Sequence, residues 1–144
     1  LRDRIEFDFI EYSRYIKVCK NVSKIKDIRK TKIILSNSLS EFIIKILKKM
    51  RINFFKEIYG SEKFDTKFEM FRKILKKYKV KPKEVVYVGD RAIDALLAER
   101  IGCVPVIVSN EASWSPLSKI VRAKPDYIIS DLSELKYIIN SLEP

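Results

Sequence analysis

The sequence lacks the features that mark a membrane protein or a disulfide-bonded secreted one. No apolar stretch approaches the ~20 residues that a membrane-spanning helix needs, and we expect no signal peptide. Cysteine is scarce: Cys19 and Cys103 lie far apart and form no metal-ligand spacing. A reduced, cytoplasmic setting fits these two cysteines best.

Glycine is also scarce, with only three in 144 residues. A chain so sparing with glycine is expected to place each one where backbone freedom is needed. Gly102 follows a predicted helix and suits a left-handed cap. Gly89 lies directly after an apolar run and directly before Asp90, which makes this the most informative of the three positions.

Acidic residues are outnumbered by basic ones, 19 to 30, which gives a formal net charge of +11. Such a charge attracts polyanions. The lysines are scattered along predicted helices as on a solvated surface, and no aromatic–basic interleaving of the kind that stacks bases is present. We therefore expect one packed domain with an ordinary basic surface, and no binding of nucleic acid or membrane.

Apolar runs and helical spacings alternate along the chain, which predicts strands and helices in turn. The predicted strands are residues 32–35, 85–88, 104–108 and 126–129, and the predicted helices begin near residues 38, 68, 91 and 131. A brief segment at 57–59, to which no structure is assigned, ends at Gly60. Ser38 and Glu41 have the spacing of a capping box for the first helix. The run at 85–88 is typical of a strand covered on both faces. This order predicts an α/β fold, a Rossmann-like parallel sheet with helices on both faces.

Polar residues follow the predicted strands at their carboxyl ends, where open parallel sheets bind ligands. Ser36 and Asn37 follow the first strand and could offer a hydroxyl and backbone amides to a phosphate. Asp90 and Asp94 lie one helical turn apart and could face one Mg²⁺. A helix N-cap followed by a first-turn aspartate explains the same spacing. Lys67 could neutralise phosphate charge or simply be solvated.

The order of these signals, a hydroxyl, a lysine and then Val-Val-Tyr-Val-Gly-Asp-Arg-Ala-Ile-Asp at residues 85–94, resembles the second, third and fourth motifs of the haloacid dehalogenase-like (HAD) hydrolases. Residues 79–84 and 124–135 are similar to that family as well, so the resemblance covers about residues 31–142. It implies a Mg²⁺-dependent phosphatase in which an aspartate at the tip of the central strand attacks a phosphate monoester and becomes an aspartyl-phosphate.

The resemblance also implies a role for each candidate residue. Ser36 and Asn37 would bind the phosphate, and Lys67 would steady the phosphate and the nucleophile. Asp90 and Asp94 would hold Mg²⁺. The family often has proline after its lysine, whereas this chain has phenylalanine there, and Lys63 is a competing candidate.

The family's first motif, Asp-x-Asp at the end of a hydrophobic strand, is absent from the sequence. Asp8 could be a degenerate nucleophile, but Ile10 then stands where the acid/base aspartate belongs and Glu6 would be buried in a sheet. The helical alternative places Leu1, Ile5, Phe9, Tyr12 and Ile16 on one face. We favour this alternative, with residues 1–30 as the end of a helical cap and its linker and residues 31–144 as the C-terminal part of the core.

The first strand of the family lies between the strands at residues 32–35 and 85–88, so we expect the sheet of this chain to lack its central strand. Each buried backbone group left unpaired costs about 1–3 kcal/mol. The chain begins with Leu1 rather than Met, and a missing N-terminal piece is expected. We expect an N-terminal fragment or a second chain to supply the strand, and this chain alone to be inactive.

Several functions remain open. The leading hypothesis is a phosphatase acting on a small phosphorylated metabolite, by analogy of the nucleotidase or phosphoglycolate type. The alternative is a catalytically inactive HAD-like interaction or regulatory module. A response-regulator receiver shares the aspartate, hydroxyl and lysine but has them in a different order, and a nucleic-acid-binding protein would bind with steep salt dependence.

Overall fold

The computed structural model describes residues 21–111 and 113–143. These residues form two compact units, and each is described by itself. Unit 1 comprises residues 29–70, and unit 2 comprises residues 21–28 together with those from 71 onward. The predictions for residues 1–20, which concern the cap helix, the degenerate first strand and Cys19, lie outside the described residues. No helix in the described part of the chain is long and apolar enough to cross a membrane.

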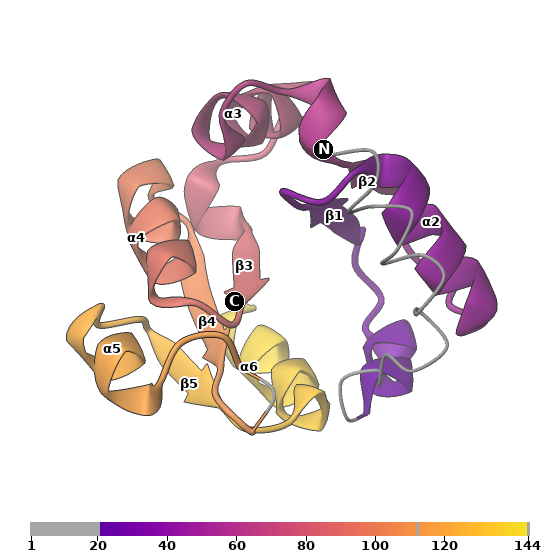
Figure 1. The fold of residues 1–144 in the computed structure, drawn as a ribbon. Helices are drawn as coiled ribbons and strands as arrows, with labels where there is room; N and C mark the ends of the chain where they lie inside the picture. Colours follow the sequence, from indigo (N-terminus) through magenta and orange to yellow (C-terminus); the bar gives the residue numbers. More distant parts are fainter. Residues whose placement is uncertain (1–20, 112, 144) are drawn as a thin grey trace. The chain divides into compact units, whose positions relative to one another are not determined.

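Unit 1 is built on a two-stranded parallel sheet. Strand β1 (Ile33–Leu35) pairs with β2 (Glu57–Tyr59), and helix α2 (Ser40–Lys49) connects the two strands and packs against β2. Figure 1 shows α2 running alongside this sheet. A short 3-10 helix, η3 (Ser61–Lys63), follows β2, and α3 (Lys67–Tyr78) begins in this unit. The strand predicted at 32–35 and the helix predicted from about residue 68 are confirmed.

The start of α2 differs from the prediction. The expected capping box of Ser38 and Glu41 is wrong, because Leu39 is the N-cap residue and its own side chain makes no capping bond. Ser40 instead begins the helix with a buried side chain, whose Oγ donates to Glu62 Oε2 at 2.8 Å and accepts the Gly60 N–H at 2.8 Å. Glu62 Oε1 also accepts the Ser40 N–H at 2.5 Å, so a carboxylate of η3 takes the place of a local cap.

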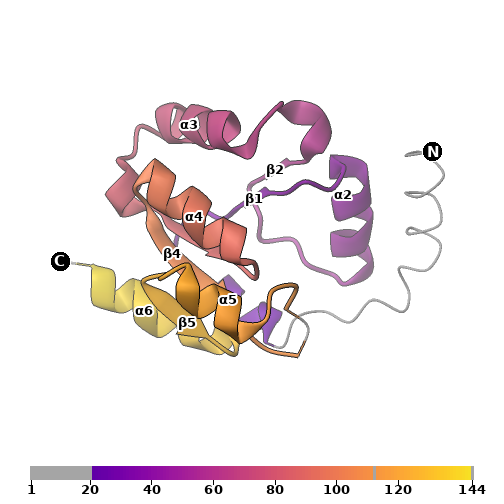
Figure 2. The ribbon, with the colours of Figure 1, turned by 60° about the vertical axis from the view of Figure 1, so that its left-hand side comes forward.

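Unit 2 is a three-stranded parallel sheet with helices on both faces. The strand order is β3-β4-β5. Its strands are β3 (Val86–Gly89), β4 (Val104–Val108) and β5 (Tyr127–Ile129); its helices are α4 (Ala92–Ile101), α5 (Leu117–Arg122) and α6 (Leu135–Leu142), with the 3-10 helices η2 (Val22–Asp27), η4 (Pro82–Glu84) and η5 (Leu132–Glu134). Figures 1 and 2 show α4 and α5 on one side of this sheet and α6 on the other.

The central strand β4 carries the core of unit 2 on both of its faces. Val106 and Val108 pack with Ile28, Ile129 and residues of η5 and α6, whereas Ile107 packs with Ala95 and Ile120 on the opposite face. Side chains alternate along a strand, so this division is the expected one for a strand covered on both sides. The predicted α/β class with parallel strands is therefore confirmed.

Strands β1 and β3 each have a single strand partner within the described residues, and they do not pair with each other. In β4, which has a neighbour on each side, four of five residues are buried. Every residue of β1 and β3 is only half-buried, although both strands are apolar. Residues 85–88 are covered on both faces as predicted, because Val86 and Val88 pack against the core around β4 and Tyr87 packs on Phe71. They stay half-buried because, among the described residues, β3 has a neighbouring strand on one side alone.

Two features of unit 2 were not expected from the sequence. Residues 22–27, assigned there to the linker, form η2, which packs with η5 against the core. No element was predicted between residues 108 and 126, yet α5 lies there and buries Ile120 completely. The signal was the helical spacing of Leu117, Ile120 and Val121 after Pro116. The predicted division at residue 30 itself stays a prediction.

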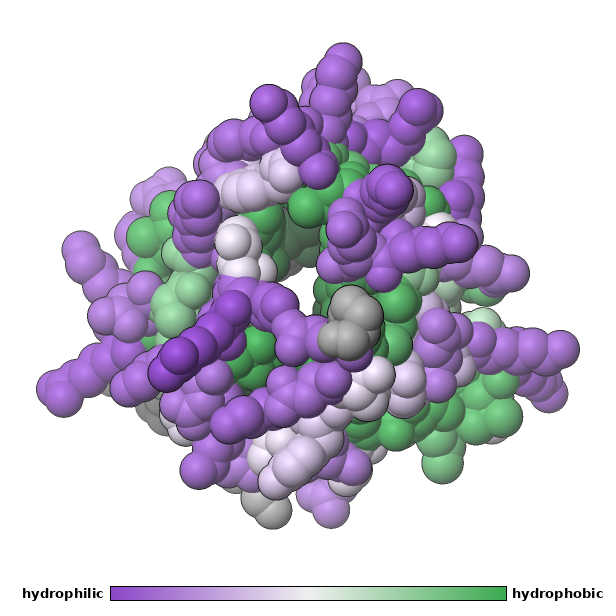
Figure 3. All heavy atoms as spheres, turned by 180° about the vertical axis from the view of Figure 1, so that it is seen from behind, coloured by the Kyte–Doolittle hydropathy of each residue, from purple (hydrophilic) through white to green (hydrophobic). Residues whose placement is uncertain are grey.

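Lysine and arginine make up 30 of the 144 residues, and many of those in the described part of the chain are exposed. On the face shown in Figure 3, hydrophilic side chains project outward, and hydrophobic residues lie between them. Lys45 is an example, with its side chain 52% exposed and its ammonium 3.0 Å from the Glu41 carboxylate one turn earlier on α2. The expectation that this chain does not bind nucleic acid stays a prediction.

Candidate active site

The two predicted metal-binding aspartates lie together at the carboxyl end of β3, in unit 2. Asp90 directly follows Gly89, the last residue of β3, and Asp94 is in the first turn of α4. Asp90 Oδ2 accepts a hydrogen bond from the Trp114 N–H at 3.3 Å. The structure therefore gives both carboxylates a place at the ligand-binding edge of a parallel sheet.

Asp94 is buried, with 6% of the residue exposed. Its Oδ2 accepts the Arg91 N–H at 3.1 Å, and its Oδ1 accepts the Tyr87 hydroxyl at 3.4 Å. Burial of Tyr87, together with the charge of Asp94, raises the pKa of that hydroxyl above its ordinary value, so it stays protonated as a donor. These contacts are those of a helix-capping carboxylate, and the role of Asp94 as a metal ligand stays a prediction.

Gly89 leaves no room for a side chain. A Cβ at this position would collide with the Cβ and the carboxylate of Asp94. Strand β3 and helix α4 can approach this closely only because the residue is glycine. The glycine before Asp90, singled out in the sequence, is therefore required by the packing of Asp94.

The predicted phosphate-binding residues lie in unit 1, at the carboxyl end of β1. The Ser36 N–H donates to the Tyr59 carbonyl at 3.0 Å, and Ser36 Oγ accepts the Ser38 N–H at 3.1 Å. A hydroxyl that accepts a bond from the backbone retains a proton to donate, which a phosphate oxygen can accept. Asn37 is exposed.

A second group in unit 1 ties the loops after β1 and β2 together. Besides the two bonds of Ser40 Oγ, the Ser61 N–H donates to the Ser38 carbonyl at 2.9 Å. Gly60 has no space for a Cβ beside Ser40. Burial raises the pKa of the Glu62 carboxyl, but hydrogen bonds from Ser40 and the charge of Lys63 lower it by more. The pKa therefore lies below its ordinary value. Sequence reasoning missed this group. The available signal was Gly60 itself, one of only three glycines in the chain.

Both candidate lysines also belong to unit 1. Lys63 Nζ donates to the Ile58 carbonyl at 2.9 Å and lies 5.7 Å from the centroid of the Tyr59 ring. Lys67 is the first residue of α3. The choice between Lys63 and Lys67 as the site lysine stays a prediction.

The predicted residues therefore fall into two groups: Asp90 and Asp94 in unit 2, and Ser36, Asn37 and Lys67 in unit 1. Their convergence on one ligand stays a prediction. Between residues 21 and 143, Ala112 apart, no three His, Cys, Asp or Glu side chains are grouped so that they could hold a metal ion. The two carboxylates are oxygen donors of the kind Mg²⁺ prefers, and as a partial set they fit an ion whose other ligands are phosphate oxygens, water and a further carboxylate.

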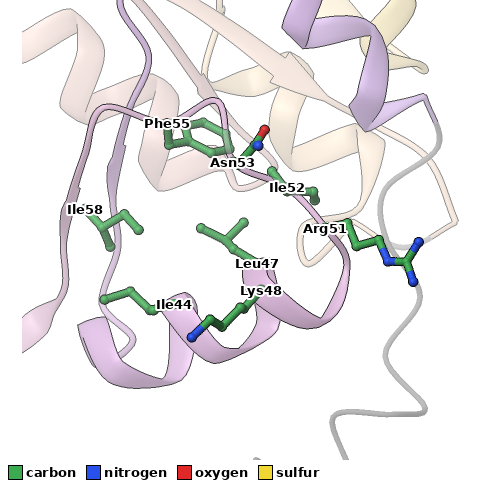
Figure 4. A pocket seen from close by; sticks show the side chains of 8 residues that line it. All are labelled: Ile44, Leu47, Lys48, Arg51, Ile52, Asn53, Phe55 and Ile58. Atoms are coloured by element: carbon green, nitrogen blue, oxygen red, sulfur yellow. The ribbon is translucent and has the colours of Figure 1, made fainter.

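Two other features do not contribute to this site. Cys103 is buried at the start of β4, and burial raises the pKa of its thiol to about 11, so it is protonated at neutral pH and is a poor nucleophile. A hollow of about 370 Å³ in unit 1 is shown in Figure 4. It is lined by the second half of α2 and the segment leading into β2, and it contains none of the predicted site residues.

Comparison with known proteins identifies the family. The family model described as haloacid dehalogenase-like hydrolase matches residues 6–108, which is more than half of the chain. The chain therefore belongs to the haloacid dehalogenase-like hydrolases. No curated protein matches the sequence.

Solved structures show the same fold. A proposed phosphatase from Clostridium difficile is 26% identical, with a TM-score of 0.74 over 85% of this chain and 60% of that protein. A predicted phosphoglycolate phosphatase from Haemophilus somnus is 23% identical, with a TM-score of 0.81 over 92% of this chain and 62% of that protein. A haloacid dehalogenase-like protein from Agrobacterium tumefaciens, 19% identical, has a TM-score of 0.82 over 97% of this chain and 68% of that one. The chain thus spans about 60% of the first two proteins.

Proposed function

We propose that this chain is the C-terminal part of the core of a Mg²⁺-dependent phosphate monoester hydrolase that acts through an aspartyl-phosphate. The observation that carries the proposal is the pair of carboxylates at the carboxyl end of β3, where Asp94 packs against Gly89 and Asp90 accepts the Trp114 N–H. Membership of a hydrolase family and the phosphatases among the solved neighbours support a hydrolase.

Each candidate residue has a chemical task in the proposed reaction. Asp90, with Asp94 beside it, would hold Mg²⁺, which when bound supplies positive charge to the phosphate oxygens. Ser36 Oγ and the backbone N–H of Asn37 would donate to the phosphate, and Lys67 would neutralise charge on the phosphate and the nucleophile. The nucleophilic aspartate forms a bond to phosphorus while the ester P–O bond breaks; water then releases inorganic phosphate.

The nucleophile and the general acid lie outside this sequence in the proposal, because none of its 144 residues forms an Asp-x-Asp pair. Strands β1 and β3 each have one described partner and are half-buried. We propose that an N-terminal fragment or a second chain supplies the first strand with this pair, and that the substrate is a small phosphorylated metabolite. The chain alone would then be inactive.

Phosphate release from p-nitrophenyl phosphate tests this function. The chain together with a polypeptide that supplies the first strand and its Asp-x-Asp pair is expected to release phosphate in Mg²⁺. Either part alone, or the pair in EDTA, is expected to release none, because the nucleophile and the metal are both required. Equal release with and without EDTA contradicts the proposal.

The absence of the Asp-x-Asp pair also favours a second candidate, an inactive HAD-like interaction or regulatory module. The two candidates differ in one respect that can be measured. If the polypeptide that completes the sheet in the cell has no paired aspartates, and the completed protein binds Mg²⁺ without releasing phosphate, the module is the correct assignment.

A further inference from the structure

The segment after β4 is joined to the Asp90 loop at two points. The N–H of Ala92, the first residue of α4, donates to Ser115 Oγ at 3.0 Å. The N–H of Trp114 donates to Asp90 Oδ2 at 3.3 Å. The first bond satisfies one of the backbone donors that a helix leaves open at its start, and the second fixes one oxygen of the carboxylate.

The same segment is anchored to the sheet on its other side. Ser113 Oγ donates to the Val108 carbonyl at 2.8 Å and accepts the Asn110 N–H at 2.9 Å. The Asn110 side-chain amide donates to the Ser130 carbonyl at 3.1 Å, just after β5. The loop following β3 is thereby connected through this segment to the ends of β4 and β5, all within unit 2.

We propose that Ser115 and the Trp114 backbone are positioning groups that fix the Asp90 carboxylate for metal binding. This rests on the proposed function, in which Asp90 holds Mg²⁺. Ser115 holds the first N–H of α4 and so restrains the turn that follows Asp90, while the Trp114 N–H sets the orientation of the carboxylate itself. Groups that orient a metal ligand in this way typically change metal affinity by about 10–100-fold when they are removed.

Mg²⁺ binding to the chain completed by its first strand, measured by isothermal titration calorimetry with inorganic phosphate present, tests the proposal. Ser115→Ala is expected to weaken binding about 10-fold, whereas Ser115→Thr, which keeps the hydroxyl, stays within about two-fold of the parent chain. Ser141→Ala is the matched control, because Ser141 is an exposed serine on α6 whose Oγ donates to the Ile138 carbonyl. Equal affinity in Ser115→Ala and Ser141→Ala overturns the proposal.

A second measurement without metal separates this proposal from the proposed function. Amide hydrogen exchange of Ala92 and Trp114 is expected to become faster in Ser115→Ala and to stay unchanged in Ser115→Thr and Ser141→Ala. If the completed parent protein binds no Mg²⁺, the metal role of Asp90 fails, and exchange alone decides whether Ser115 restrains the loop. Unchanged exchange in Ser115→Ala contradicts the restraint, and faster exchange with unaltered Mg²⁺ affinity contradicts its role in positioning the carboxylate.

Discussion

Replacing Asp90 with asparagine is expected to lower Mg²⁺-dependent phosphate release, in the chain completed by its first strand, by about 10²–10³-fold. Asparagine keeps the size of the side chain and an oxygen that can accept the Trp114 N–H. It removes the negative charge, and a neutral amide binds Mg²⁺ more weakly than a carboxylate. The loss therefore reports on the charge of Asp90 and not on the shape of the loop.

Asp126→Asn provides the matched control for this prediction. Asp126 is an exposed aspartate directly before β5, at the opposite edge of the same sheet from Asp90. The two variants are compared by kcat/KM for p-nitrophenyl phosphate over a range of Mg²⁺ concentrations. Asp126→Asn is expected to match the parent protein. If both variants retain full activity, Asp90 is not the metal ligand and the proposed function loses its main support.

Gly89→Ala is expected to destabilise unit 2 by about 1–3 kcal/mol, because overpacking a well-filled contact forces side chains and backbone to move. The added Cβ would meet the side chain of Asp94, whose carboxylate caps α4. The variant is therefore expected to lose Mg²⁺ affinity as well as stability. Urea unfolding measures the first effect, and calorimetry measures the second.

Gly102→Ala separates these two effects. Gly102 lies at φ +92°, and the nearest atom to an added Cβ is Pro82 Cβ at 3.6 Å. Its replacement is expected to cost about 1–2 kcal/mol through the left-handed backbone alone, with Mg²⁺ affinity unchanged. If Gly89→Ala also leaves Mg²⁺ affinity unchanged, the Gly89–Asp94 contact does not support the metal site.

The sequence predicted the elements whose signals are local. The apolar run before Gly89 and the helical spacing after it are contiguous, so β3, α4 and the loop that carries Asp90 could be assigned without coordinates. Gly102 likewise predicted the end of α4, because glycine readily adopts the left-handed conformation found at helix ends. Local chemistry was sufficient in both cases.

Other features could not be predicted because they depend on residues far apart in the chain. The Ser40–Glu62 hydrogen bond spans 22 residues, and the Ala92–Ser115 bond spans 23. Each uses a serine that is ordinary in its local context, and Ser38 offered a more conventional cap for α2. Only the structure shows which serine hydroxyl forms a hydrogen bond with a residue far away in the sequence.

The burial of β3 illustrates a different limit. A continuous apolar run predicts a strand that is covered on both faces, and β3 is so covered, but full burial also requires a neighbouring strand on each side. In the described structure β3 pairs only with β4 and stays half-buried. The apolar sequence of β3 is thus that of a strand with two neighbours, of which the described residues provide one.

Paramagnetic broadening of amide resonances by Mn²⁺ tests most directly whether the two groups of candidate residues serve one ligand. Mn²⁺ takes the oxygen ligands that Mg²⁺ uses, so it should bind at Asp90 in the isotopically labelled chain completed by its first strand. With phosphate present, the proposed site predicts broadening of Asp90 and Arg91 in unit 2 and of Ser36 and Asn37 in unit 1. Broadening that stays within unit 2 at every Mn²⁺ concentration would contradict a shared phosphate and metal site.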